Sequence, residues 1–202
     1  KGIEIGTNVA GKELTDPSLK LEKFFKRAAE LGVTLFMHPN GYTQAERLTD
    51  HYFNNVIGNP LDTTVAVSHL IFDGVLARNP KLRIILAHGG SYLAHYWARM
   101  DHAHRARPDC RVVIKKAPSS YLKKFYFDTI TFDTQMLRLQ IDKWGTDHVV
   151  LGDDLLRRRG SGADDEVADR APLRLGRTLH QRQHVGRDAR LDTGCACHGL
   201  WL

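Results

Sequence analysis

Apolar residues in the first 154 positions occur alternately in short continuous runs and in longer segments with helical spacing. The short runs cover residues 2–7, 33–38, 82–88, 125–129 and 148–154. Each run is short and rich in β-branched, leucine or aromatic side chains, which is typical of a buried strand. The pattern therefore predicts five strands.

Four longer segments carry apolar residues at the spacing of an amphipathic helix: 17–31, about 62–78, about 91–106 and 133–145. Asp16 followed by Pro17 is typical of a helix start. Asp133 is the expected N-cap of the last helix. A short helix is expected around Tyr121, and the stretch 39–61 is expected to be irregular.

Four ionisable side chains stand where an expected strand gives way to the next loop: His38, His88, Asp128 and Asp154. Parallel strands lie about 4.8 Å apart, so side chains from separate strand ends can reach one ion. Imidazoles and one carboxylate suit Zn²⁺ or another divalent metal, and His88 could instead act as an acid or base beside a metal-bound water. We expect Asp128 to be a structural carboxylate or to support a metal ligand.

The remaining histidines before residue 154 are expected not to be ligands: His51, His69, His95, His102, His104 and His148. They fall on expected helices, on loops or at a strand start.

Alternating strands and helices predict an α/β fold with a parallel sheet, either an open doubly wound sheet or a (β/α)8 barrel. The first strand–helix turn lacks the G-x-G-x-x-G sequence of nucleotide-binding doubly wound folds. In barrel enzymes the catalytic residues gather where the strands end, as the four ionisable residues do here. A barrel needs eight strands and about 250 residues. We therefore predict a partial (β/α)8 TIM barrel that lacks its N-terminal strands, as expected for a fragment that opens on a strand.

The composition changes sharply near residue 155. Residues 155–202 contain nine arginines but no Lys, Phe, Tyr, Ile, Asn or Met. The six missing types have A/T-rich codons, which favours the hypothesis of a shifted reading frame in a G/C-rich gene. The alternative is a disordered Arg-rich tail. We expect two parts, the C-terminal part of a barrel over 1–154 and an atypical tail over 155–202.

The net charge of +6 does not indicate a nucleic-acid-binding protein. Residues 1–154 carry 20 basic and 17 acidic side chains, and residues 155–202 carry nine and six. Neither part has a basic stripe interleaved with aromatic residues. No apolar run reaches the ~20 residues of a membrane span, and no signal peptide opens the chain. Three cysteines make no disulfide framework, so we expect a cytoplasmic protein without nucleic-acid or membrane partners.

Four segments resemble one enzyme family: LFMHP, NPLDTTVAVSHLIFDGVLARNPKLRIILAHGG, RMDHAHRARPD and VVLGDD. In this order and spacing they resemble the amidohydrolase-related decarboxylase family, which includes aminocarboxymuconate-semialdehyde and resorcylate-type decarboxylases. The resemblance covers about residues 2–154. It implies a (β/α)8 barrel and a divalent metal, usually zinc.

The resemblance implies roles for five residues. His38 matches a metal-ligating histidine, and His88 matches the catalytic histidine that assists a metal-bound water. Asp154 matches the metal-ligating aspartate of a Gly-x-Asp-Tyr-Pro motif. Arg99 stands where relatives place an arginine that crosses a dimer interface to hold a substrate carboxylate, a task that suits a guanidinium fork. Asn55 replaces a tryptophan that lies near the substrate in the semialdehyde decarboxylases, which leaves room for a different substrate.

The sequence departs from the family at both ends of the match. The first family strand carries an H-x-H or E-x-H metal-binding pair that is missing here, and Leu155-Leu156 replace the Tyr-Pro pair. For the intact protein, the resemblance implies non-oxidative decarboxylation of a small unsaturated or aromatic carboxylic acid by a homodimer. We expect impaired activity in this piece, because only two protein metal ligands remain. The alternatives are hydrolysis of a lactone or an amide at the same metal site, and a catalytically inactive fragment.

Overall fold

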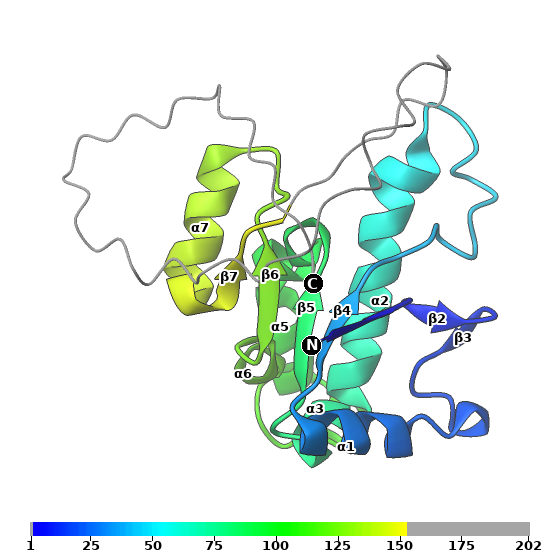
Figure 1. Cartoon of the computed structure of the whole chain (residues 1–202), viewed down its shortest axis with the longest axis vertical. Helices are drawn as coiled ribbons and strands as arrows, with labels where there is room; N and C mark the ends of the chain where they lie inside the picture. Colours follow the sequence, from blue (N-terminus) through cyan, green and yellow to red (C-terminus); the bar gives the residue numbers. More distant parts are fainter. Residues whose placement is uncertain (1, 153–202) are drawn as a thin grey trace.

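A parallel sheet forms the centre of the computed structural model, which describes residues 2–152. Its five strands pair in the order β1 (Gly2–Ile5), β4 (Thr34–Met37), β5 (Arg83–Leu86), β6 (Phe125–Asp128) and β7 (Val149–Val150) (Figure 1). The small antiparallel pair of β2 (Asn8–Val9) and β3 (Lys12–Glu13) follows β1. A doubly wound sheet reverses its strand order at a switch point. The described strands instead follow one another in chain order, as the strands of a (β/α)8 barrel do.

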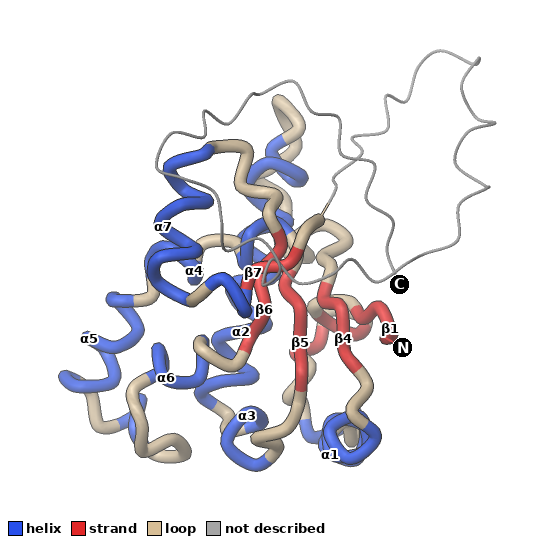
Figure 2. The backbone as a smooth tube through the Cα atoms, turned by 60° about the vertical axis from the view of Figure 1, so that its left-hand side comes forward, coloured by secondary structure: helices blue, strands red, loops and turns tan. Residues whose placement is uncertain are grey.

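Helices fill the connections between the strands: α1 (Glu22–Leu31), α2 (Asn59–Phe72), α3 (Val75–Arg78), α4 (Leu93–Tyr96), α5 (Ala98–Ala106), α6 (Pro118–Leu122) and α7 (Thr134–Trp144). Figure 2 shows α2, α5 and α7 on the same side of the sheet. Short 3-10 turns cover Pro17–Leu19, His88–Gly90, Asp109–Arg111 and Thr146–His148. Within residues 2–152, no helix combines the length and the apolar character that crossing a membrane requires.

One face of the sheet is buried along its three central strands. Alternate residues of the three central strands have no exposed surface: Leu35, Met37, Ile84, Leu86, Phe125 and Phe127. The strand register aligns them in two rows across the sheet, where they join the core with apolar residues of α2. The side chains between them, Phe36, Ile85 and Tyr126, are only half-buried. The helices thus cover one face of the sheet. The side chains on the opposite face remain partly exposed within residues 2–152.

Three expected elements differ from the structure in detail. The helix expected at 62–78 is two helices, because Gly74 has a φ of 79°, which no α-helical residue adopts. The helix expected at 91–106 is divided at Trp97. The first helix begins with a 3-10 turn capped by Asp16, and α1 follows a left-handed residue, Lys20.

The stretch expected to be irregular contains a π-helical segment, Asn54–Gly58, which leads directly into α2. Two side chains of these helical turns hold the preceding loop. Asn54 Oδ1 accepts from the backbone N–H of Tyr42 at 2.9 Å, and Asn59 Oδ1 accepts from that of Gly41 at 2.8 Å. The expected cap of α7 is confirmed, since Asp133 Oδ1 accepts from a backbone N–H in the first turn at 2.8 Å.

We predict that Phe127→Ala lowers the free energy of unfolding by about 3–5 kcal/mol, because it opens a cavity in the fully buried face. Urea denaturation measures this change. The matched control is Leu139→Ala on α7, whose side chain is 51% exposed and whose loss should change stability by less than about 0.5 kcal/mol. Equal effects of the two substitutions would contradict this assignment of the core.

Candidate active site at the carboxyl ends of the strands

Two imidazoles meet at the carboxyl edge of the sheet. His38 follows β4 and His88 follows β5, and these strands end level because Met37 pairs with Leu86. The backbone N–H of His38 donates to the carbonyl of Ile5 at 3.0 Å, so the ladder with β1 continues to this residue. The two ring centroids lie 5.0 Å apart, with 58° between the ring planes. Both residues are half-buried, and Nδ1 of His88 is itself a buried atom.

The turn that carries His88 has an unusual backbone. Its four residues, His88 to Ser91, have φ values of 56°, 62°, 73° and 60°. Glycine adopts such angles freely, whereas they are strained for His88 and for Ser91. At Gly90 a side chain is also excluded sterically, because a Cβ would overlap with Cδ1 of Phe127.

The carboxylate of Asp128, at the end of β6, holds this turn. It accepts hydrogen bonds from the backbone N–H groups of His88 at 3.0 Å, Gly89 at 2.5 Å and Ile130 at 3.0 Å. Its side chain is only 3% exposed, and charge-assisted hydrogen bonds in such surroundings are strong. The structural role expected for Asp128 is confirmed, and it consists of fixing the backbone of His88.

Gln140 of α7 supports Asp128 from the helix layer. Its Nε2 donates to the backbone carbonyl of Asp128 at 3.0 Å, and its side chain is completely buried. The sequence gives a weak signal for this residue, namely a polar side chain within a helix of otherwise apolar inward positions. Gln140 does not stand at a strand end, because it lies near the middle of a helix.

The other expected site residues have different positions. Arg99 lies on α5 with an exposed side chain, and Figure 2 shows α5 away from the ends of β4 and β5. Asn55 lies in the π-helical segment and is half-buried. Asp154 lies outside the described residues. Within one chain, the structure therefore brings His38 and His88 together and does not bring Arg99 to them.

The described residues alone do not complete a metal site. Residues 2–152 contain no group of three His, Cys, Asp or Glu side chains arranged to hold an ion, whereas catalytic zinc sites have about three protein ligands. Four other histidines hydrogen-bond to protein groups away from this edge: His69 to Asp73 at 3.0 Å, His95 to the Met136 carbonyl at 3.2 Å, His104 to the Ile114 carbonyl at 3.2 Å and His148 to the Phe125 carbonyl at 2.7 Å. A metal at the carboxyl edge would need a ligand from beyond residues 2–152.

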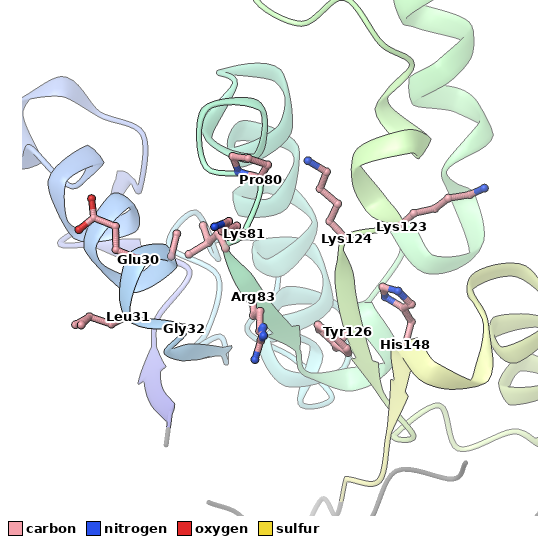
Figure 3. A pocket seen from close by; sticks show the side chains of 12 residues that line it. Glu30, Leu31, Gly32, Pro80, Lys81, Arg83, Lys123, Lys124, Tyr126 and His148 are labelled. Atoms are coloured by element: carbon pink, nitrogen blue, oxygen red, sulfur yellow. The ribbon is translucent and has the colours of Figure 1, made fainter.

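A hollow of about 550 Å³ lies at the opposite, amino end of the strands (Figure 3). Arg83 extends from the start of β5, and Lys123 and Lys124 precede β6. Burial lowers the pKa of Lys124, and the charge of Lys116 lowers it further. The hollow is cationic, but His38 and His88 are not among its lining residues. Enzymes with parallel α/β sheets bind their substrates at the carboxyl ends of the strands, so we place the candidate site at the histidines.

Comparison with known proteins identifies the family. Residues 1–182 match the model of the family described as amidohydrolase. The chain belongs to the amidohydrolase family. It is 36% identical over 154 residues to 2-amino-3-carboxymuconate-6-semialdehyde decarboxylase from Dictyostelium discoideum, and 30% identical over 183 residues to the protein of that name from Caenorhabditis elegans. Each match covers 76% of this chain but only 42% and 46% of the relatives, so the chain spans less than half of their length.

Solved structures of decarboxylases share the fold of this amidohydrolase-family chain. The crystal structure of 5-carboxyvanillate decarboxylase from Sphingomonas paucimobilis superimposes with a TM-score of 0.70 over 77% of the chain and 48% of that protein, at 23% identity. A 2,6-dihydroxybenzoate decarboxylase complexed with 2,6-dihydroxybenzoate gives a TM-score of 0.63 at 25% identity, over 72% of this chain and 46% of that one. A dihydroxybenzoic acid decarboxylase from Polaromonas with bound manganese gives 0.58 at 25% identity, over 64% and 41%.

We predict that Asp128→Ala lowers the free energy of unfolding by about 2–4 kcal/mol, since it leaves buried N–H groups without an acceptor. Amide hydrogen exchange should accelerate at His88 and Gly89, whose N–H groups bond this carboxylate. The control is Asp133→Ala, which removes an exposed helix cap and should cost about 1 kcal/mol without affecting those two amides. Unchanged exchange at His88 and Gly89 in Asp128→Ala would show that this carboxylate does not hold the turn.

Proposed function

We propose that the intact protein is a metal-dependent decarboxylase that acts on an unsaturated or aromatic carboxylic acid without oxidation. The observation that carries the proposal is the meeting of the His38 and His88 rings, 5.0 Å apart, at the carboxyl edge of a parallel sheet. The family and the decarboxylase names of the curated relatives support this reaction in preference to others.

The names of the relatives suggest the chemical class of the substrate. One neighbour structure holds 2,6-dihydroxybenzoate, and two relatives are named for 2-amino-3-carboxymuconate-6-semialdehyde. In both compounds a carbon that bears a carboxylate has a neighbour that carries a hydroxyl or an amino group. We propose a substrate with the same arrangement.

His88 is the proposed proton carrier of the reaction. It would deliver a proton to the substrate carbon that bears the carboxylate, and an electron pair of the conjugated system would form the new C–H bond. The bond to the carboxylate then breaks, CO2 leaves, and the released pair restores the conjugated system. A proton donor fixed by its own backbone, as His88 is by Asp128, suits this transfer.

The other site residues are assigned by resemblance to the family. His38 and Asp154 would hold a divalent metal, zinc or the manganese present in neighbouring structures, and such an ion acts as a Lewis acid toward a carboxylate. Arg99 would hold the substrate carboxylate of a second copy in a homodimer, which agrees with its exposed side chain. Asn55 would line the substrate pocket.

The same proposal extends to the architecture. A partial (β/α)8 barrel over residues 1–154 is supported by the strand order and the parallel pairing. It is also supported by the half-buried side chains on the face opposite the helices, which would line the inside of a barrel. The atypical tail expected over residues 155–202 lies outside the described residues.

The match of residues 1–182 to the amidohydrolase model favours a second candidate, hydrolysis of a lactone or an amide. The two reactions differ in their products. Decarboxylation releases CO2 from the acid, whereas hydrolysis opens a ring or cleaves an amide and releases no CO2.

We predict that His88→Asn in the intact protein lowers the rate of CO2 release from 2,6-dihydroxybenzoate or a related acid by about 10²–10⁴-fold, since it removes the proton carrier. Metal content, measured by elemental analysis, should not change in this variant. His38→Ala should lose both metal and activity. His102→Ala, which alters an exposed side chain of α5, is the control and should retain both. A His38→Ala variant with full metal content and activity would contradict the assignment of the ligand, and ring opening without CO2 would favour the hydrolase.

A further inference from the structure

The hydroxyl group of Ser91 is buried without a hydrogen-bond partner. The side chain is 8% exposed, and Oγ bonds to no other group within the part of the chain that the structure describes. A buried hydroxyl without a partner lowers the stability of a folded protein. Such a group in a native structure therefore calls for an explanation.

The backbone of Ser91 is unfavourable for an independent reason. Its φ of 60° and ψ of −144° lie in a region that glycine occupies almost alone. The two preceding residues, Gly89 and Gly90, are glycines with positive φ. A third glycine would relieve the strain and would also remove the buried hydroxyl. Strained residues of this kind cluster at ligand-binding positions, where the surrounding structure holds them in place.

The turn fixes Ser91 next to the candidate site. Its backbone N–H donates to the carbonyl of His88 at 2.9 Å, which closes the turn on that residue. The next residue, Tyr92, donates its backbone N–H to Oγ1 of Thr64 on α2 at 3.3 Å. Ser91 is therefore held between the end of β5 and α2, one turn from the imidazole at the site.

We propose that the Ser91 hydroxyl binds the polar substituent that neighbours the substrate carboxylate and so selects acids that carry it. This inference rests on the proposed function. A serine hydroxyl donates one hydrogen bond and accepts others, so it fits a hydroxyl or an amino group. An acid without the substituent leaves Ser91 as unpartnered as it is in the free protein, and sites that offer a buried polar group discriminate against ligands that lack its partner.

Two ligands and two variants test the proposal. Calorimetry measures the Kd of 2,6-dihydroxybenzoate and of benzoate, which lacks the hydroxyl groups, for the wild type, Ser91→Ala and Ser91→Gly. The wild type should prefer 2,6-dihydroxybenzoate. Both variants should weaken the binding of 2,6-dihydroxybenzoate about 5–10-fold, the effect of one lost hydrogen bond, and should bind benzoate as the wild type does.

Thermal unfolding of the ligand-free protein separates the hydroxyl from the strain. Ser91→Ala should not lower Tm, because it removes a buried hydroxyl that has no partner among the described residues, and Ser91→Gly should raise Tm by roughly 2–8 °C, since it also relieves the backbone strain. A Tm that falls by several degrees in Ser91→Ala would reveal a structural partner and overturn the proposal. Equal losses for both acids, or no loss for either, would also overturn it.

The proposed function and the role of Ser91 fail in different ways. A wild type that binds neither acid contradicts the proposed function and the role of Ser91 with it. A wild type that prefers 2,6-dihydroxybenzoate, with unchanged binding in Ser91→Ala, contradicts the role of Ser91 alone.

Discussion

The candidate site depends on the hydrogen bonds that the carboxylate of Asp128 accepts from the turn after β5. The carboxylate accepts hydrogen bonds from the backbone N–H groups of His88 and Gly89. These bonds hold the turn after β5 in a conformation that an isolated chain would avoid. Asp128 itself is fixed by its position on β6 and by the bond from Gln140 to its carbonyl. The position of the His88 imidazole therefore depends on β6, which carries Asp128, and on α7, which carries Gln140.

The register of β4 and β5, which end at the same level, determines the position of His38 relative to His88. Parallel pairing in this register places His38 directly beside the turn, so that no long loop is needed to bring the two rings together. The site thus lies next to rows of fully buried side chains. The backbone strain at His88 and Ser91 serves the proposed chemistry rather than stability.

Much of this arrangement could be predicted from the sequence, because short apolar runs identify strands and parallel strands bring their ends to one edge. The meeting of His38 and His88 is such a case. The division of the helix at Gly74 could not be predicted, since a glycine permits the left-handed φ of 79° found there but does not require it. The hydrogen bonds of Asp128 and the strain at Ser91 were also out of reach, because both depend on backbone angles that a Gly-Gly pair permits but does not specify.

The most direct test of the account is a nuclear Overhauser measurement between the ring protons of His38 and His88. The Tyr126 and His148 rings, whose centroids are also 5.0 Å apart, provide an internal standard in the same spectrum. Cross-peaks are expected for both pairs of rings. A cross-peak for Tyr126 and His148 together with none for His38 and His88 would show that the two histidines do not share a site.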